Sequence, residues 1–369
     1  MTLTHQPSVR NQPRKPHDKQ HGERVGPGRT DQLLRLLPRL IAPVALAAIL
    51  FIFSLLSPVF LTVDNLAGVL SQMAILALVA VGLTVVVRAG GIDLSVGVAL
   101  DLAALAAAAL IADGYRAWVA IIAGLVFGLL VGAVNALLVV GLRIPPFLAT
   151  LSVWFIGTSV QQLLTGGGAP IYLSTPRVPI EFALLGRGYV VDLDGVVISA
   201  AIVAVVVAVL LGLTRWGRSV TAAGEQPSAA RISGLRIHRL QISAYLLCSL
   251  VAAFAGVILA SRTNGFVPGS GQAYLMDAIG AVFIGATLSR FGRASVPGTL
   301  VGVLIFALLS NGMNLIGLSF FWQGLGRGIV LLAILLLGVL LSRGDTARAG
   351  AIKRLFAKPA ATIHRQKAE

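Results

Sequence analysis

The sequence predicts an all-α polytopic membrane protein with about ten transmembrane helices and both termini in the cytoplasm. Of its 369 residues, 57% are hydrophobic and only 12% are charged, whereas water-soluble domains carry about 25% charged residues. The apolar residues form continuous runs, which fit membrane helices and not the alternating strands of a membrane barrel. The excess of basic residues lies outside these runs. Composition, patterning and charge therefore agree on one fold class.

Ten apolar runs are long enough for a helix to cross the hydrocarbon core of a bilayer, which takes about 20 residues. They are residues 40–60, 66–87, 94–112, 117–141, 147–165, 196–213, 240–260, 273–289, 296–316 and 324–341. The third and eighth runs are the weakest candidates because they contain Asp101 and Asp277. Residues 40–341 thus form the predicted transmembrane domain, between a basic disordered tail at 1–39 and a second basic tail at 342–369.

The basic residues predict which side of the membrane each connection occupies. Segments 1–39, 214–239 and 343–369 hold 20 of the 29 Lys and Arg residues but only six of the 14 Asp and Glu residues. Cytoplasmic segments of membrane proteins are enriched in Lys and Arg, and an even number of spans places both tails on one side. We therefore expect the loop 214–239 in the cytoplasm and the long loop 166–195 outside. The bilayer accounts for the charge, and we expect no nucleic-acid partner.

The sequence does not contain the residues that several kinds of catalysis require. A phosphate-binding loop ends in Gly-Lys-Ser/Thr, yet none of the five lysines follows a glycine. Four of the five histidines lie in the tails and His238 lies in the cytoplasmic loop, while the single Cys248 lies in an apolar run, so neither a metal cluster nor a disulfide is expected. We expect no enzymatic activity, no catalytic residue, no metal site and no cofactor on this chain.

A nine-residue motif, AGGIDLSVG, follows the second apolar run at 89–97. Its adjacent glycines permit a tight turn without a Cβ penalty. Its aspartate can cap the next helix by accepting backbone N–H groups at the positive end of the helix dipole. The residues of this turn are Gly90, Gly91, Asp93, Ser95 and Gly97.

Further motifs follow in order along the chain. They are a run from Gly132 through Asn135 to RIPPFLATL at 143–151, AARISGL at 229–235, YLMDAIGAVFIGAT at 274–287, GRASVPGT at 292–299 and SNGMNLIG at 310–317. Pro145 and Pro146 are well suited to start a helix. Together with AGGIDLSVG, these motifs resemble the permease subunits of ribose-type sugar ABC importers over about residues 40–341. That family covers the uptake of ribose, xylose, arabinose, galactose and autoinducer.

The resemblance has specific implications for partners and location. It implies a multi-pass protein of the bacterial cell (inner or plasma) membrane, paired with a second permease copy or a paralogue as a homo- or heterodimer. It implies ABC ATPase subunits that hold the ATP and Mg, and an extracytoplasmic sugar-binding protein. The segment AARISGL resembles the coupling helix that docks on the ATPase, with Ala229, Ala230, Arg231, Ser233 and Gly234 as its residues.

The coupling segment departs from the family pattern, in which an acidic residue usually precedes the paired alanines. Here Gln226, Pro227 and Ser228 occupy that stretch and Glu225 lies slightly earlier. Pro227 can still open a short helix at its first position. On the other side of the membrane, the loop 166–195 is long for a connector. We expect it to seat the binding protein and to allow a short helix around 181–186.

A neutral sugar requires hydroxyl and amide partners along its path. Candidates are Asn135, Thr158, Gln161, Gln162, Asn311 and Asn314; the alternative role for each is a hydrogen bond between helices. Asp101 and Asp277 are added because a carboxylate within a membrane span is a functional candidate by default. The alternative for these two is that they face a wet cavity or lie near a helix end.

The function expected from these observations is the translocation path for a monosaccharide delivered by a binding protein. Two alternatives remain open. One is an ABC permease for nucleosides or branched-chain amino acids. The other is a secondary transporter driven by protons through Asp101 and Asp277, which would work without an ATPase.

Overall fold

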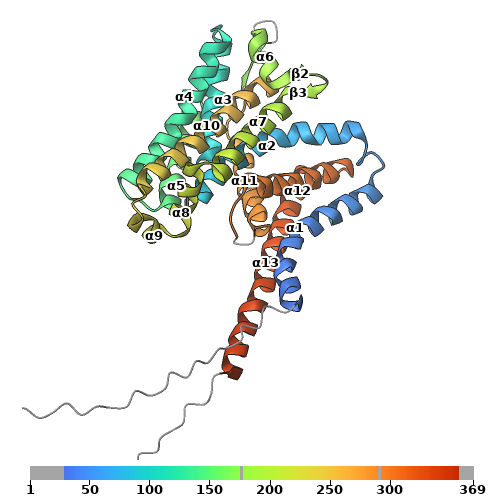
Figure 1. Cartoon of the computed structure of the whole chain (residues 1–369). Coiled ribbons are helices and arrows are strands. Elements are labelled where there is room, and N and C mark those ends of the chain that lie inside the picture. Colours follow the sequence, from blue (N-terminus) through green and yellow to red (C-terminus); the bar gives the residue numbers. More distant parts are fainter. Residues whose placement is uncertain (1–28, 175–177, 290–291, 357–369) are drawn as a thin grey trace, which may run out of the picture.

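The computed structural model describes residues 29–174, 178–289 and 292–356, and helices dominate these ranges (Figure 1). The long helices are α1 (Arg29–Leu56), α2 (Val63–Arg88), α3 (Val96–Ala112), α4 (Ala117–Ala136) with the π-helical segment η1 (Leu137–Gly141), α5 (Pro146–Leu164), α7 (Gly195–Leu213), α10 (Ile237–Thr263), α11 (Ser270–Thr287), α12 (Val296–Leu315) and α13 (Phe320–Phe356). The short elements are α6 (Ile180–Arg187), α8 (Arg215–Glu225), α9 (Pro227–Ile232), β1 (Ile171–Tyr172), β2 (Tyr189–Val190), β3 (Leu193–Asp194) and β4 (Gly265–Phe266). The predicted helical class is confirmed.

Seven helices in the described part of the chain are long and apolar enough to cross a membrane. They are α2, α4 with η1, α5, α7, α10, α12 and the segment Phe321–Leu340 of α13. The apolar parts of α1 (Leu40–Leu56) and α3 are shorter, and α11 contains Asp277. Each of the ten predicted runs coincides with a helix. The total of ten crossings and the cytoplasmic termini stay predictions.

Two helices extend beyond the predicted domain limits. Helix α1 begins at Arg29 and not at 40, and α13 continues to Phe356 and not to 341. Leu and Arg dominate the extension of α1, and Ala and Arg are the most frequent residues in that of α13; all three are strong helix formers. The rest of the two predicted tails, 1–28 and 357–369, lies outside the described residues.

Helices α3, α4 and α10 form a closely packed group. A side chain on Gly128 of α4 would overlap Ala253 of α10, and one on Gly132 would overlap Ser249. Small residues four apart let helix backbones approach closely. The glycines spaced four apart in α4 therefore serve helix packing.

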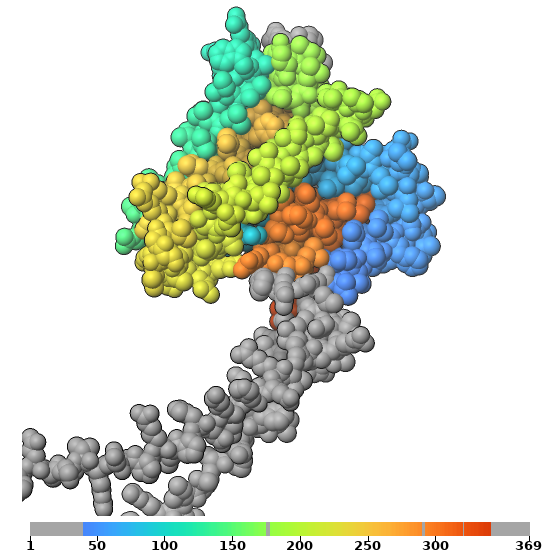
Figure 2. All heavy atoms as spheres, in the orientation of Figure 1, coloured from blue at the N-terminus to red at the C-terminus, as the bar shows by residue number. Residues whose placement is uncertain are grey.

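The remaining long helices build the other part of the molecule. Helices α11 and α12 pack on each other and on α2, while α13 packs on α1 and α12. In Figure 2, α12 (orange) lies between α7 (yellow-green) and α1 (blue) on the displayed face. Much of the membrane-length part of α13 is exposed, as are large apolar side chains of α4, α5 and α7. Such surfaces suit contact with lipid or with another membrane helix.

Candidate translocation cavity and coupling segment

A cavity of about 450 Å³ lies between α2, α10, α11, α12 and α13. Its polar lining residues are Ser71, Gln72, Arg262, Thr263, Tyr274, Asp277, Ser310, Gln323 and Arg327. They come from the N-terminal parts of α2, α11 and α13 and the C-terminal parts of α10 and α12. These are the helix ends that the charge pattern places on the outer side of the membrane.

The cavity contains an ion pair between two helices. Arg327 Nη1 of α13 contacts Asp277 Oδ2 of α11, and the two side chains are 16% and 20% exposed. Arg327 Nε also donates to the carbonyl oxygen of Gln323, at 3.3 Å. Our sequence analysis selected Asp277 but missed Arg327. The signal was available, because Arg327 is the one cationic residue in the predicted run 324–341.

Asp101 lies away from this cavity and binds the start of α11. Its carboxylate is 2% exposed, and Oδ1 accepts the Gly271 backbone N–H at 2.8 Å. Nearby, Gln161 Oε1 accepts the Gly269 N–H at 2.9 Å. A negative charge is favourable at a helix N-terminus. A side chain on Gly97 would overlap the backbone of Gly271, so α3 and the start of α11 touch directly.

The other predicted path residues occupy separate places. Thr158 Oγ1 donates to the Trp154 carbonyl oxygen within α5, at 2.8 Å. Asn311 of α12 and Asn65 of α2 exchange two amide hydrogen bonds, each 2.9 Å long. Gln162 and Asn314 are exposed. Of the eight predicted path residues, only Asp277 lines the cavity, and a role in translocation for the others stays a prediction.

The polar residues of the AGGIDLSVG motif bind one another. Asp93 Oδ1 accepts the Ser95 N–H at 2.8 Å and the Ser95 hydroxyl at 2.7 Å. Asn135 Nδ2 of α4 donates to Ser95 Oγ at 2.6 Å and to Asp93 Oδ1 at 3.3 Å. Ser95 is itself the N-cap residue of α3. Asp93 therefore fixes the turn before α3 and joins it to α4. We had expected its carboxylate to accept backbone N–H groups in the first turn of α3 instead.

The glycines of the same motif form the predicted turn and bring it against α8. Gly90 has a φ of +81°, which favours glycine. A Cβ on Gly90 would lie 3.0 Å from Gly224 Cα, and one on Gly91 would lie 2.8 Å from the Tyr245 hydroxyl. Conversely, a side chain on Gly224 would overlap the Arg88 carbonyl oxygen. The end of α2 and α8 are therefore in backbone contact.

The predicted coupling segment forms the short helix α9. Pro227 occupies its first turn, as predicted. Ala230 is buried with Ala223 and Ile237. Gly234, just past the helix, has a φ of +80°. The remaining residues of the segment face outward: Ala229, Arg231, Ile232 and Ser233 are exposed.

Polar contacts join α8 to α2 and to the connection between α11 and α12. Arg293 Nη2 donates to Glu225 Oε2 at 2.6 Å. Arg88 Nε donates to Thr221 Oγ1 at 2.9 Å, and its Nη1 donates to the carbonyl oxygen of Ala294 at 2.7 Å. We name this group of contacts the cytoplasmic latch, after the side of the membrane on which the charge pattern predicts it. Sequence analysis missed it because its residues are far apart in the chain.

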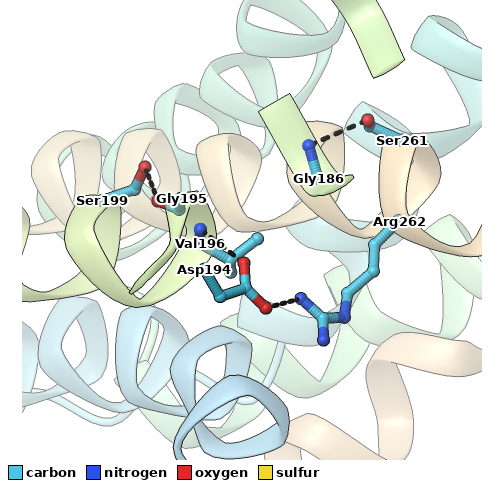
Figure 3. A network of polar contacts seen from close by, with 7 residues as sticks. All are labelled: Gly186, Asp194, Gly195, Val196, Ser199, Ser261 and Arg262. Atoms are coloured by element: carbon cyan, nitrogen blue, oxygen red, sulfur yellow. Dashed lines mark hydrogen bonds and ion pairs between the residues drawn. The ribbon is translucent and has the colours of Figure 1, made fainter. Parts of the chain in front are cut away.

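On the opposite side, the loop 166–195 folds onto the end of α10 (Figure 3). The helix predicted around 181–186 is present as α6, and the Gly186 N–H donates to Ser261 Oγ at 3.0 Å. Strand β1 also pairs antiparallel with β4, which follows α10 directly. The described residues of this loop are thus packed on the end of α10.

An ion pair connects this loop to the cavity wall. Arg262 Nη1 lies 2.8 Å from Asp194 Oδ2, and Asp194 Oδ1 accepts the Val196 N–H at 2.9 Å (Figure 3). Burial opposes ionisation of this carboxylate, but the bonds from Arg262 and Val196 outweigh it and hold the pKa of Asp194 below its usual value. Arg262 also lines the cavity. One arginine therefore touches both the cavity and the loop 166–195, which we call the outer loop because the charge pattern predicts it outside the membrane.

The chain was compared with known proteins. The profile of the family described as "Branched-chain amino acid transport system / permease component" matches residues 65–337. The chain is 38% identical over 289 residues to the ribose import permease protein RbsC of Bacillus subtilis, which covers 78% of this chain and 89% of that protein. It is 36% identical over 293 residues to RbsC of Escherichia coli K12, covering 79% and 91%. It is 29% identical over 296 residues to the galactose/methyl galactoside import permease protein MglC of Haemophilus influenzae, covering 75% and 87%. No solved structure matches the chain.

Proposed function

Because the chain belongs to the permease-component family of branched-chain amino acid transport systems, we propose that it forms the path by which a monosaccharide crosses the bacterial cell membrane. It is a multi-pass membrane subunit of an ABC importer. The proposed cargo is a pentose or hexose of the ribose, xylose, arabinose or galactose class. The proposed source of the cargo is an extracytoplasmic binding protein.

One observation carries the choice of a sugar. The ribose import permeases of two distant bacteria are 36–38% identical to the chain and match it over about nine tenths of their own length. The cavity is consistent with this cargo, because its lining combines hydroxyl, amide and paired charged groups. Such a lining can hydrogen-bond a neutral polyhydroxylated molecule without meeting an unbalanced charge.

The cytoplasmic latch supports a route for the driving force. We place α9 in a groove of the partner ATPase, where ATP and Mg bind, as the family implies. Movement of α9 would pass to α8, which Glu225 and Arg293 join to the connection between α11 and α12, and which Thr221 and Arg88 join to α2. Helices α2, α11 and α12 wall the cavity. The chain supplies the moving walls, and its partner supplies the energy.

The outer loop supports a role in receiving the binding protein. Its hairpin of β2 and β3 exposes a group of apolar side chains: Tyr189, Val190, Val191 and Leu193. Asp194 at the end of this hairpin holds Arg262 of the cavity wall. A binding protein that docks on 166–195 would therefore contact a structure bonded directly to the cavity.

One structural feature favours a second cargo, a branched-chain amino acid. A branched-chain amino acid is a zwitterion, and the cavity offers one carboxylate and one guanidinium for its two charges. The name of the family is compatible with it. To bind in this way, the amino acid would have to separate Asp277 from Arg327, whereas a sugar would not.

The proposal is tested by reconstitution. The chain, its ATPase and its binding protein are placed in proteoliposomes, and uptake of radiolabelled ribose, galactose and leucine is measured with and without ATP. We expect ATP-dependent uptake of a sugar and none of leucine. The chain alone, under a pH gradient, is the control for a secondary transporter. Uptake by the chain alone, or of leucine only, would overturn the proposal.

A further inference from the structure

We propose that the cavity between α2, α10, α11, α12 and α13 is an outward-facing sugar-binding site contained within one chain. The inference rests on the proposed function and adds the place where the sugar waits after the binding protein releases it. The Asp277–Arg327 pair is its central recognition element, and Gln72, Tyr274 and Gln323 line the same cavity.

The size and lining of the cavity suit a small polar ligand. Its volume of about 450 Å³ lies within the roughly 300–1,000 Å³ of ordinary ligand sites. Polar groups within the membrane region are costly and are usually retained for function. Here five helices bring nine polar side chains to one space.

The geometry of the ion pair leaves groups for a ligand. Among the described residues, Asp277 and Arg327 are joined through Oδ2 and Nη1 alone, while Arg327 Nε bonds to Gln323. Asp277 Oδ1 and Arg327 Nη2 therefore keep hydrogen-bonding capacity. A carboxylate oxygen accepts from one sugar hydroxyl and a guanidinium N–H donates to another. The ring of Tyr274 offers an apolar face for the C–H side of a sugar.

The charges of the cavity favour a neutral ligand. Arg262 is neutralised by Asp194 outside the cavity, and Arg327 is neutralised by Asp277 inside it. No charge in the described lining is left without a counter-charge. A neutral sugar can thus bind while both pairs stay intact, and an ionised solute must disrupt one of them.

The position of Ser310 allows a direct test by cysteine labelling. Ser310 lines the cavity, and the one native cysteine, Cys248, is fully buried. In proteoliposomes that hold the complete importer, a membrane-impermeant thiol reagent should label Ser310→Cys from outside and leave the unsubstituted chain unlabelled. D-ribose should slow this labelling by about tenfold at a concentration about tenfold above its dissociation constant. Leucine should give no protection.

A matched control and a second variant keep the test decisive. Asp113→Cys, on an exposed turn after α3, should be labelled at a rate that sugar does not change. In a Ser310→Cys chain that also carries Asp277→Asn and Arg327→Gln, protection by ribose should disappear while labelling persists. Labelling of Ser310→Cys without sugar protection, or protection by leucine alone, would overturn the site. If the same vesicles still import ribose with ATP, only the site is wrong; if no sugar enters, the proposed function fails.

Discussion

Two groups of helices in this molecule differ in what lies between their helices. In the group α3, α4 and α10, glycines bring backbones together until no side chain would fit at Gly124, Gly128 or Gly132. In the group α2, α11, α12 and α13, glycines also bring α11 and α12 together at Gly285 and Gly302, but a polar cavity with an ion pair lies between the helices. Close packing gives a body that cannot change shape without loss of contacts. The cavity lies between the helices that we propose to move and to bind the sugar.

The connections of the two groups support the same division. The signature turn joins α3 to α4 through Asp93, Ser95 and Asn135. The cytoplasmic latch instead attaches α8 to the end of α2 and to the connection that leads into α12. We infer that α3, α4 and α10 form a rigid frame. The helices α2, α11, α12 and α13, which we call the cavity group, form the moving part.

The largest effect is expected when a bulky side chain is introduced between the closely packed helices of the frame. Gly128→Leu would force a branched side chain against Ala253, whose Cβ would already overlap a Cβ at this position, and overpacking typically costs about 1–3 kcal/mol and occasionally more. We expect little folded protein in the membrane, measured as the monodisperse fraction in detergent. Gly212→Leu on α7 is the matched control, because a side chain there meets nothing within 4 Å. Equal loss in both variants would contradict the assignment of Gly128 to a closely packed helix contact.

The next effect concerns the charges of the cavity group. Arg327→Gln leaves the carboxylate of Asp277 unpaired, and removal of one partner of a buried pair costs about 3–5 kcal/mol. The cost should be smaller here, because the cavity keeps both side chains partly accessible. We expect reduced thermal stability and strongly reduced sugar uptake.

The neutral double variant Asp277→Asn with Arg327→Gln separates the two effects. It should recover the thermal stability, because no charge is left unpaired, but it should not recover the uptake of sugar. Thermal unfolding and ATP-driven uptake are measured on the same preparations. Recovery of both properties would assign the pair to stability alone.

A third prediction concerns the cytoplasmic latch. Its side chains at Glu225 and Arg293 are 38% and 37% exposed, and exposed pairs contribute about 0–1 kcal/mol to stability. Glu225→Arg should therefore leave the thermal stability nearly unchanged while it reduces sugar uptake per ATP hydrolysed, since α8 no longer holds the connection to α12. Adding Arg293→Glu restores the opposite charges and should restore coupling. Normal coupling in the single variant would exclude a role in transmission.

The sequence predicted the helices better than their contacts. Continuous apolar runs and proline at 146 and 227 place helices where the structure has them, because these signals are local. The pairing of β1 with β4 escaped prediction, since it joins residues about ninety positions apart. The extension of α1 was missed because the basic tail at 1–39 was predicted to be disordered, and that of α13 because the predicted span ends with the apolar run at 341.

The candidate site was predictable only in part. Asp277 was found because a carboxylate in an apolar run is conspicuous, and the same reasoning applied to arginine would have found Arg327. Asp101 was found by the same rule, yet it binds the backbone of α11. Whether a membrane carboxylate faces a cavity or a helix end depends on tertiary packing, which a single run of residues does not contain.

The smallest effect is a pH dependence of the stability that Asp194 contributes through its ion pair with Arg262, near the end of α10. The pKa of Asp194 lies below its usual value, so its ionised form stabilises the folded state. In the unfolded chain this carboxyl takes up a proton near pH 3.9. Its contribution is therefore complete above about pH 4–5 and is lost as the pH falls through the lower folded-state value.

Asp194→Asn tests this contribution against Asp192→Asn, which removes an exposed carboxylate from the same hairpin. The Asp194 variant should unfold at a lower temperature than the control at pH 7, because Arg262 loses its partner and α10 loses a bond to the outer loop. The difference should shrink only as the pH falls below the usual carboxyl pKa and through the lower folded-state value, where the native carboxyl is protonated too. A difference that stays constant across this range would mean that Asp194 acts through the neutral hydrogen bond to Val196, and that Arg262 does not need a charge to hold the loop at the cavity.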